Sequence, residues 1–443
     1  MTISSNKKSL RQQLIHGAIG SAIIQIATRI LALVLGVVLA RGLGAEGYGI
    51  YSYAFAFLAL MMVVAELGMP TLVLRQIASY HSKEDWPHIR GILLSTLQIA
   101  FLSSVILAVI VVFSLYQIDS EIISEQSWAV IFVMILLPFL VITKLITTVI
   151  QSLQHVVKAK LVDVVKIIIV TIGLGLLFYF YPEMRTPKYA VVIQLVSTIL
   201  VLFLAVALLY RYLPQQVRAV PAQYQSRQWL ASAIPLTLIG GASIINNQAD
   251  ILMLGYFRTP EEVGIYRVAV QGSALVSFGL QAVNSVIAPQ FARLYAQNDL
   301  ARLQQIVTKS ARAILLLAFP IAFVFIFVGG ELAGWAFGLE FAQSHSAIAI
   351  LTAGQLINAA MGSVGFLLNM TGFEKDVART LFLTAGLNII LNLFLIPLYG
   401  MEGAAIATAI SLALWNIALY KIVKIRIGIN STAFYFSDYG KEL

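Results

Sequence analysis

The chain is 443 residues long, and 60% of its residues are hydrophobic while only 11% are charged, which gives a mean hydropathy of +0.89. This composition excludes an ordinary soluble globular domain and is typical of a protein that crosses a membrane several times. The sequence has no cysteine, which excludes disulfides and thiolate sites, and its net charge of +9 has the sign of the positive-inside bias of membrane proteins, so we expect no nucleic-acid partner.

The first elements in the chain are two long apolar runs. Residues 1–13 are polar and basic, and residues 14–40 follow with Arg29 as their only charge. This run is longer than the apolar region of a signal peptide, so we interpret it as a retained helix. Residues 50–77 form the second run. Because about 20 apolar residues of helix cross a bilayer core of about 30 Å, the two runs predict a transmembrane hairpin that turns at residues 44–51.

The turn recurs in the second half of the chain at a constant offset of 215 residues. The matched positions are Leu39 and Leu254, Glu46 and Glu261, Gly49 and Gly264, Ile50 and Ile265, Tyr51 and Tyr266, Ala54 and Ala269, Leu60 and Leu275, and Tyr80 and Tyr295. Self-similarity at a fixed offset indicates two related halves.

Further apolar runs extend the pattern to twelve predicted spans. They cover residues 14–40, 50–77, 91–115, 128–152, 161–181, 189–210, 229–255, 265–291, 309–328, 345–371, 378–396 and 403–423. We therefore expect an all-α polytopic membrane protein with two six-helix repeats (6+6) around a central cavity. The domains would be an N-terminal bundle over 1–210, a cytoplasmic linker over 211–228 with a short amphipathic helix, a C-terminal bundle over 229–423 and a cytoplasmic tail over 424–443.

The distribution of basic residues predicts the orientation. Most of the 29 lysines and arginines fall in the segments that are cytoplasmic if the N-terminus is inside. Both termini are then cytoplasmic, and residues 78–90 and 292–308 lie inside while 116–127 and 329–344 lie outside. None of these segments is long enough for a soluble catalytic or nucleotide-binding domain, so we expect no enzymatic activity and no catalytic residues.

Two local motifs have simple structural interpretations. Residues 42–47 match the pattern G-x-G-x-x-G, but a dinucleotide site needs a preceding strand, so we interpret them as a tight turn between helices. The five histidines have no metal-ligand spacing, and we expect no metal site.

Polar residues line one face of several predicted helices. In the first helix they recur at steps of three and four: Gly17, Ser21, Gln25, Arg29, Ala32, Gly36 and Ala40. Other faces carry Ser243, Asn246, Asn247 and Asp250; Arg267, Gln271, Ala274, Phe278, Gln281 and Ser285; and Asn358, Asn369, Asn388 and Asn392. Small residues alone would indicate close helix packing. The amides and charges favour a water-accessible cavity over purely structural hydrogen bonding.

The charges within spans give the sharpest functional signal. A charge at the centre of a membrane helix costs about 2.5–3.5 kcal/mol and must face a partner or water. Arg29, Lys144, Lys166 and Arg267 correspond, at the offset of 215, to the uncharged Ile244, Ala359, Leu381 and Ser52. The repeat can therefore be built without these charges, which suggests a function beyond folding. For Lys166 and Asp163, a local ion pair or snorkelling explains the charges equally well.

Three strings of residues resemble a known family. They are Leu39-Ala40-Arg41-Gly42-Leu43-Gly44-Ala45-Glu46-Gly47-Tyr48-Gly49-Ile50-Tyr51, Glu66-Leu67-Gly68 with Leu74-Arg75, and Ala249-Asp250-Ile251-Leu252-Met253-Leu254-Gly255. They resemble the polysaccharide transporter family, the oligosaccharide repeat-unit flippases of the multidrug/oligosaccharidyl-lipid/polysaccharide flippase superfamily. The twelve-helix layout, similar to that of the MATE transporters, extends the resemblance over nearly the whole chain. Glu66 differs from the aspartate usual at its position.

The resemblance implies a flippase in a bacterial plasma (inner) membrane. Its substrate would be an undecaprenyl-diphosphate-linked oligosaccharide for O-antigen, capsule or exopolysaccharide assembly, and its partners the polymerase and chain-length machinery. Candidate substrate contacts are Arg29, Gln25, Lys144, Lys166, Arg267, Gln271, Asn246 and Asn247. Asp250 and Glu66 are candidates for coupling to a proton or sodium gradient, with no bound cofactor.

Two other functions fit parts of the pattern. A multidrug or cation antiporter of the same fold would need an anionic cavity, whereas cations outnumber acids here. A membrane glycosyltransferase or polymerase would need a large outer loop, and the longest one expected here, residues 329–344, contains no arginine.

Overall fold

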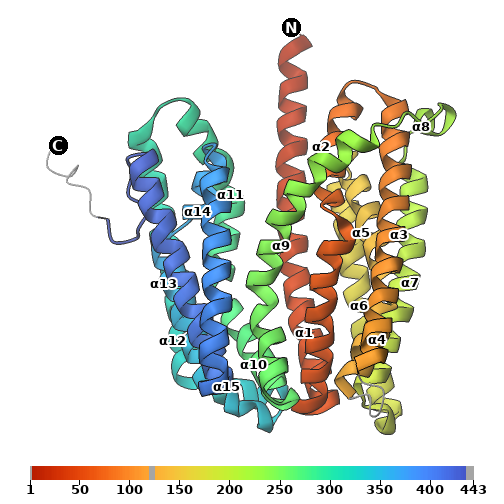
Figure 1. The fold of residues 1–443 in the computed structure, drawn as a ribbon. Coiled ribbons are helices and arrows are strands. Elements are labelled where there is room, and N and C mark those ends of the chain that lie inside the picture. Colours follow the sequence, from red (N-terminus) through yellow and green to blue (C-terminus); the bar gives the residue numbers. More distant parts are fainter. Residues whose placement is uncertain (1, 119–124, 436–443) are drawn as a thin grey trace, which may run out of the picture. The chain divides into compact units, whose positions relative to one another are not determined.

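The computed structural model describes residues 2–118 and 125–435, which fold into helices and include no strand. Figure 1 shows the helices in chain order. They are α1 (Thr2–Glu66), α2 (Met69–Ser82), α3 (Trp86–Ile118), α4 (Glu125–Met134), α5 (Leu137–Ser152), α6 (Val156–Phe180), η1 (Pro182–Met184), α7 (Pro187–Tyr212), α8 (Gln215–Ala219), α9 (Ser226–Phe257), α10 (Pro260–Ala274), α11 (Phe278–Ala296), α12 (Leu300–Phe337), η2 (Leu339–Ser344), α13 (His345–Met361), α14 (Val364–Met370) and α15 (Glu374–Arg426). The expected outer segment 116–127 and the tail 424–443 lie partly outside the described residues.

Many of these helices are long and apolar enough to cross a membrane. Within the described ranges, 7 helices meet that condition, or up to 9 if each of two bent pairs is one span. In a bilayer core only helices and closed barrels satisfy every backbone hydrogen bond. The protein is therefore a multi-pass, all-helical membrane protein.

Two of the long helices contain a sharp turn at a glycine. α1 turns at Gly44, which has φ 70° and ψ 177°, and α15 turns at Gly400, which has φ 58°. Only glycine adopts such backbone angles without strain. The turn predicted at residues 44–51 is thus found at its first residue, Gly44, and residues 45–51 already belong to the second limb of α1. Thr259, which lies 215 positions after Gly44, is the N-cap of α10, so the second copy of the motif also follows a break.

The expected span 50–77 is interrupted, which corrects the sequence prediction of one continuous helix. α1 ends at Glu66 because Leu67 (φ 47°) and Gly68 (φ 67°) have left-handed backbone angles, and Pro70 then starts a new helix. The spans expected over 128–152 and 345–371 are bent by 42° and 44° at the α4–α5 and α13–α14 breaks. A third break separates α10 from α11 inside the expected span 265–291.

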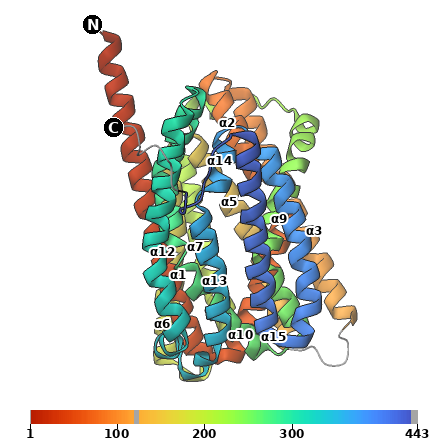
Figure 2. The same cartoon turned by 90° about the vertical axis from the view of Figure 1, so that its left-hand side faces the viewer.

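The chain divides into two compact units, residues 1–244 and 245–443, and the division falls inside α9. In unit 1, α1 packs against α4 and α6, while α5 packs against α2, α3, α6 and α7. Figure 1 shows these helices side by side, and in Figure 2 the unit 2 helices α12, α13 and α15 lie side by side.

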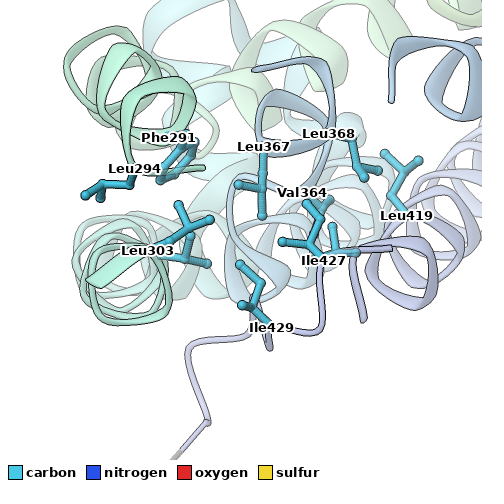
Figure 3. Close-up of a cluster of buried hydrophobic side chains, with 11 residues drawn as sticks. Phe291, Leu294, Leu303, Val364, Leu367, Leu368, Leu419, Ile427 and Ile429 are labelled. Carbon is cyan, nitrogen blue, oxygen red and sulfur yellow. The ribbon is translucent and has the colours of Figure 1, made fainter. Parts of the chain in front are cut away.

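In unit 2, α13 packs between α12 and α15, and a hydrophobic cluster closes one end of the bundle. Side chains from α11, α12, α14 and α15 meet there around Leu367, which is fully buried (Figure 3). The segment after α15 completes the cluster with Ile427 and Ile429. The side chain of Gln304 on α12 holds this segment by donating to the Asn430 carbonyl at 2.6 Å and accepting from the Asn430 amide at 2.7 Å.

The segment expected to be a linker, residues 211–228, contains the short helix α8 and is fastened to the start of α3. Arg90 donates hydrogen bonds to the carbonyls of Arg218 and Val220 at 2.9 and 2.6 Å. Gln223 donates its amide to the Pro87 carbonyl at 3.1 Å. Gly91 permits this approach, because a Cβ at that position would lie 1.8 Å from the Gln223 carbonyl oxygen.

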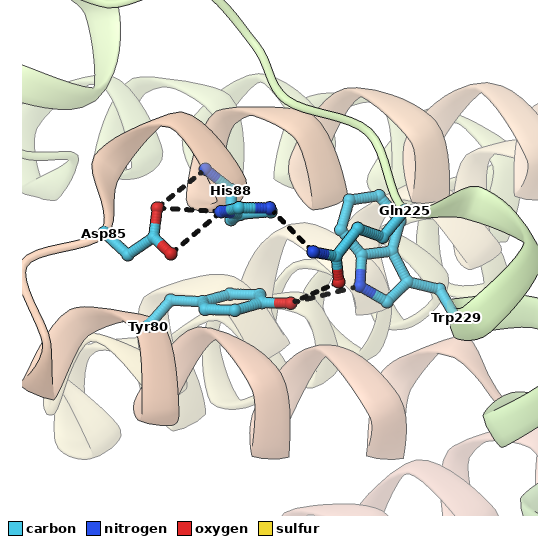
Figure 4. A network of polar contacts seen from close by, with 5 residues as sticks. All are labelled: Tyr80, Asp85, His88, Gln225 and Trp229. Atoms are coloured by element: carbon cyan, nitrogen blue, oxygen red, sulfur yellow. Dashed lines mark hydrogen bonds and ion pairs between the residues drawn. The ribbon is translucent and has the colours of Figure 1, made fainter.

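A polar network then fixes the beginning of α9 to the α2–α3 connection (Figure 4). His88 donates from Nδ1 to Asp85 at 2.8 Å and accepts at Nε2 from the Gln225 amide at 2.9 Å. Tyr80 stacks on His88 and accepts a hydrogen bond from the Trp229 indole at 3.3 Å. The first turns of α9 are thereby part of unit 1.

Candidate functional site

Unit 1 places an ion pair at the end of α1. The Lys144 ammonium on α5 lies 2.8 Å from Oε2 of Glu66, whose side chain is only 9% exposed, while that of Lys144 is 50% exposed. Oε1 of Glu66 is buried and has no hydrogen-bond partner within the described residues. The two residues were expected to serve separately, Lys144 in substrate binding and Glu66 in coupling, and the structure brings them together.

The break after α1 explains why Glu66 lies there. Ser103 on α3 donates its hydroxyl to the Ala65 carbonyl at 2.6 Å, which satisfies a carbonyl that the interrupted helix leaves open. α9 presses against the other side, since a Cβ on Gly68 would lie 2.5 Å from the Ala233 carbonyl oxygen. The Glu66-Leu67-Gly68 string therefore acts as a tightly packed turn that presents the carboxylate to α5.

Three further charges on α6 lie close to this pair. Asp163 lies within electrostatic range of Lys166, Lys144 and Lys160. Asp163 is exposed, and Lys166 and Lys160 are half-buried. Lys166 and Lys144 therefore both act on the Asp163 carboxylate, and the local ion pair of Lys166 with Asp163 that the sequence allowed stays a prediction. Together with the ion pair, these residues form a group of three cations (Lys144, Lys160 and Lys166) and two carboxylates (Glu66 and Asp163). An anion would therefore be attracted to the group.

The polar face of α1 precedes this group. Gln25 and Arg29 are both exposed on α1, the helix that packs against α6. Exposure within a span of this helix means that the side chains face lipid, water or a ligand rather than the core of unit 1. The surroundings of Gly17 and of the side chains of Ser21 and Ser285 are not among the described features.

Unit 2 contains a different polar centre around Asp250 on α9, which is 6% exposed. Its carboxylate accepts hydrogen bonds from the Tyr266 hydroxyl at 2.9 Å, the Asn392 amide at 2.8 Å and the Thr408 hydroxyl. The Asn392 amide also donates to Oδ1 of Asn388 at 3.0 Å. Oδ1 of Asn392 is buried and has no partner among the residues that the structure describes. The donors to this buried carboxylate among the described residues are therefore neutral groups.

Sequence reasoning found part of this centre. Asp250, Asn388 and Asn392 were assigned to polar helix faces, but Tyr266 and Thr408 were not. Tyr266 belongs to the repeated turn motif, and its spacing of 16 residues from Asp250 across a helix break gave no sign of contact. Thr408 lies on the second limb of α15, beyond Gly400, so only the fold brings it near Asp250.

The remaining candidates of unit 2 differ in their exposure. Asn246 is half-buried and Asn247 exposed one turn before Asp250, and Arg267 and Gln271 are half-buried on α10. No group of three or more His, Cys, Asp or Glu residues in the described part of the chain could hold a metal ion. The Asp250 centre instead offers one carboxylate with amide and hydroxyl oxygens, which are hard ligands for a proton or an alkali cation.

Comparison with known proteins agrees with these features. Residues 14–295 match the family described as polysaccharide biosynthesis protein. The probable low-salt glycan biosynthesis flippase Agl15 of Haloferax volcanii is 30% identical over 164 residues, which are 37% of this chain and 35% of Agl15. The alignment thus spans about a third of that relative.

Two solved structures share the fold over most of the chain. An inward-facing multidrug resistance MATE family transporter superposes with a TM-score of 0.73 at 14% identity, covering 92% of this chain and 98% of the transporter. The lipid II flippase MurJ gives a TM-score of 0.73 at 16% identity, with 91% and 87% coverage. The resemblance deduced from the sequence motifs is confirmed, and the chain belongs to the polysaccharide biosynthesis protein family, with the fold of multidrug and lipid II transporters.

Proposed function

We propose that the protein flips undecaprenyl-diphosphate-linked oligosaccharide units from the inner to the outer leaflet of a bacterial plasma membrane. The observation that carries this proposal is the group of cations held within the spans of unit 1 in a chain of the polysaccharide biosynthesis family. A diphosphate cannot enter hydrocarbon without compensation, because an isolated buried charge is very costly. The products would serve O-antigen, capsule or exopolysaccharide assembly, with a polymerase and chain-length machinery as partners.

The proposed architecture is twelve spans in two six-helix repeats with both termini cytoplasmic. The turns of α1 at Gly44 and of α15 at Gly400 support it, because each divides one long helix into two limbs. With the bent pairs α4–α5 and α13–α14 each counted as one span, the described part of the first half offers six limbs and that of the second half five, and the broken pair α10–α11 would be the sixth. Transport would proceed by alternating access, in which one substrate site opens to each side of the membrane in turn.

Arginine and lysine would have different tasks on the substrate. Arg29 matches two phosphate oxygens with its planar guanidinium, and Lys144 and Lys166 supply point charges. Gln25, Gln271, Asn246 and Asn247 offer amides to sugar hydroxyls, and Arg267 offers a second guanidinium in unit 2.

The Asp250 centre is our candidate for coupling to a proton or sodium gradient. The unpaired Oδ1 of Asn392 supports this role, because a bound cation would give that buried oxygen a partner. Sodium would have the Asp250 carboxylate and the oxygens of Asn388, Asn392 and Thr408 within the network as ligands. Glu66, already paired with Lys144, is the second candidate.

A multidrug antiporter of the same fold is not favoured, because the family match and the glycan flippase relative both point to glycans. The test is reconstitution of the purified protein in liposomes that contain an undecaprenyl-diphosphate-linked oligosaccharide. The outer-leaflet fraction would be measured with a membrane-impermeant glycan-modifying enzyme. Transport of a cationic dye but not of the lipid-linked glycan would reject the proposal.

A further inference from the structure

Two cavities occur at one end of unit 1 and share a single side chain, that of Trp128. The first, here called the rim pocket, has a volume of about 710 Å³ and is lined by Glu46, Glu125, Trp128, Arg185, Lys188 and Tyr189. The second, here called the α3–α4 groove, has a volume of about 750 Å³ and is lined by Phe101, Val109, Tyr116, Trp128, Ile135 and Phe139, among other apolar residues. Neither contains a residue assigned above to substrate binding or coupling.

The rim pocket has walls of opposite charge. Arg185 comes from the connection between α6 and α7 and Lys188 from the first turn of α7, while the carboxylates come from the turn of α1 and the start of α4. Arg185 is fixed by donating from Nε and Nη2 to the Phe178 carbonyl at 3.1 and 3.0 Å. A phosphate would be attracted to the cationic wall, and sugar hydroxyls would donate hydrogen bonds to the carboxylates of the opposite wall.

Aromatic side chains complete this set. Trp128 is 47% exposed and Tyr189 is half-buried in the same pocket, so both can present a ring face to a sugar. Charged groups of both signs beside aromatic faces suit a glycosylated phosphate better than a hydrophobic drug.

The α3–α4 groove is lined almost entirely by apolar surface. Along α3 it extends from Phe101 to Tyr116, about 22 Å at about 1.5 Å per residue. Each leaflet of a bilayer core of about 30 Å is about 15 Å deep, which is the depth that an ordinary acyl chain fills. The groove therefore passes the midplane and suits a longer hydrocarbon chain.

Trp128 marks the boundary between the two cavities. Tryptophan and tyrosine concentrate at the level of the lipid headgroups, and Tyr116 and Trp128 both lie at the end of the groove that meets the rim pocket. A polar site on one side of this boundary and an apolar groove on the other match the two parts of an amphiphile with a very long tail.

The geometry points to a docking site for the lipid-linked glycan on the outside of unit 1, with the phosphate and first sugar in the rim pocket and the polyprenyl tail in the α3–α4 groove. On the proposed orientation the rim pocket faces outward, so the site would hold the product after flipping. This inference rests on the proposed function, because it takes the same lipid as its ligand. It adds a second place for that lipid, separate from the charged group of α1, α5 and α6.

The experiment measures lipid retention by native mass spectrometry of the full chain. The probes are undecaprenyl-diphosphate-linked N-acetylglucosamine and phosphatidylethanolamine, supplied in competition. Val109→Trp fills the groove at a side chain that is 62% exposed, and Val196→Trp is the matched control on α7, outside both cavities, at 49% exposure. Lys188→Glu reverses a charge on the cationic wall.

We expect the wild type to retain the glycolipid at least tenfold over phosphatidylethanolamine. Val109→Trp and Lys188→Glu should each lower retention at least fivefold, and Val196→Trp should not. Equal retention of phosphatidylethanolamine, or an unchanged Val109→Trp variant, would overturn the site. Flipping by the wild type in liposomes separates the two failures: if it flips while Val109→Trp retains lipid normally, only the docking site is wrong, and if it does not flip, the proposed function fails as well.

Discussion

At the scale of single residues, the charged groups inside the spans differ in what stabilises them. Glu66 is stabilised by a cation, Lys144, that is itself half exposed. Asp250 is stabilised by two hydroxyls and an amide and has no cation among its hydrogen-bond donors. The first arrangement leaves a positive charge available to a ligand, and the second leaves a negative charge available to a small cation. Substitutions at the two centres should therefore have different effects.

The first prediction concerns Arg29, which is exposed on α1 within a span. Arg29→Ala should insert normally but abolish surface polysaccharide, and Arg29→Lys should retain only part of it, because lysine cannot bind two phosphate oxygens in a planar fork. Polysaccharide is quantified at equal membrane abundance, with Arg267→Ala as the milder comparison. Wild-type polysaccharide in the alanine variant would show that Arg29 does not bind substrate.

The second prediction concerns the ion pair of unit 1. Lys144→Met leaves the buried Glu66 carboxylate without its cation and should cost about 1–3 kcal/mol of stability, less than for a fully buried pair because Lys144 is half exposed. Adding Glu66→Gln should restore most of the loss. Thermal unfolding of the purified variants measures both effects. Equal destabilisation by the single and double variants would mean that the pair contributes no coupling energy.

The third prediction concerns Asp250. Asp250→Asn keeps the size of the side chain but removes its charge, so transport should fall at least tenfold in a sodium or proton gradient while the protein remains folded. Initial rates in liposomes with and without each gradient measure this, and Tyr266→Phe, which removes one donor to Asp250, serves as the milder control. A gradient response equal to that of the wild type in Asp250→Asn would limit Asp250 to a structural role.

At the scale of helices, breaks and close contacts depend on particular glycines. Gly44 and Gly400 turn the two longest helices, and Gly68 separates α1 from α2. The turn at Gly44 could be predicted because polar residues surround it. The break at Leu67 and Gly68 was missed although Gly68 and Pro70 are local signals for a helix end and a helix start, because the run is long enough for one span and membrane helices tolerate glycine and proline.

The fourth prediction tests how the connecting segment is fastened. Gly91→Ala should lower the unfolding temperature by several degrees and expose residues 211–225 to protease, because the new Cβ would collide with the Gln223 carbonyl at 1.8 Å. Gly175→Ala is the matched control, since a Cβ there meets no described atom within 4 Å and alanine favours the helix by about 0.5–1 kcal/mol. Similar behaviour of the two variants would show that the contact with α3 is dispensable.

At the scale of the whole molecule, the two units are related in sequence but carry different chemistry. Asp250, Asn392 and Thr408 correspond, at the offset of 215, to Leu35, Leu177 and Ile193. In the other direction, Glu66 and Lys144 correspond to Gln281 and Ala359. Each half has thus acquired a polar centre that its counterpart lacks, as expected if one attracts the anionic substrate and the other takes the coupling ion.

The sequence predicted the class of fold well, because apolar run length, repeated motifs and the family strings are all local signals. It also located the ionisable residues, since charges are rare within spans. It could not predict which of them meet. The contact between Lys144 and Glu66 joins positions 78 residues apart, and that between Thr408 and Asp250 joins positions 158 apart. Such pairings depend on helix packing and on breaks that composition does not reveal.

The fifth prediction concerns orientation. Because the sequence contains no cysteine, single cysteines can be introduced without a prior replacement. A membrane-impermeant maleimide added to intact cells or protoplasts should label Glu340→Cys and should label Ser82→Cys only after lysis. Both positions are exposed, so access to the side chain does not limit the reaction. Labelling of Ser82→Cys in intact cells and of Glu340→Cys only after lysis would show that the topology is the opposite of the predicted one.

The segment after α15 has a consequence for how the protein is made. All parts of unit 1 precede residue 245, so this bundle can assemble while the rest of the chain is still on the ribosome. Unit 2 differs, because Gln304 and Arg312 on α12 bind the backbone at Asn430, Ala433 and Tyr435. The partners of α12 are therefore synthesised more than 100 residues after it. A nascent chain interrupted in that interval would have an incomplete second bundle, which membrane proteases could degrade.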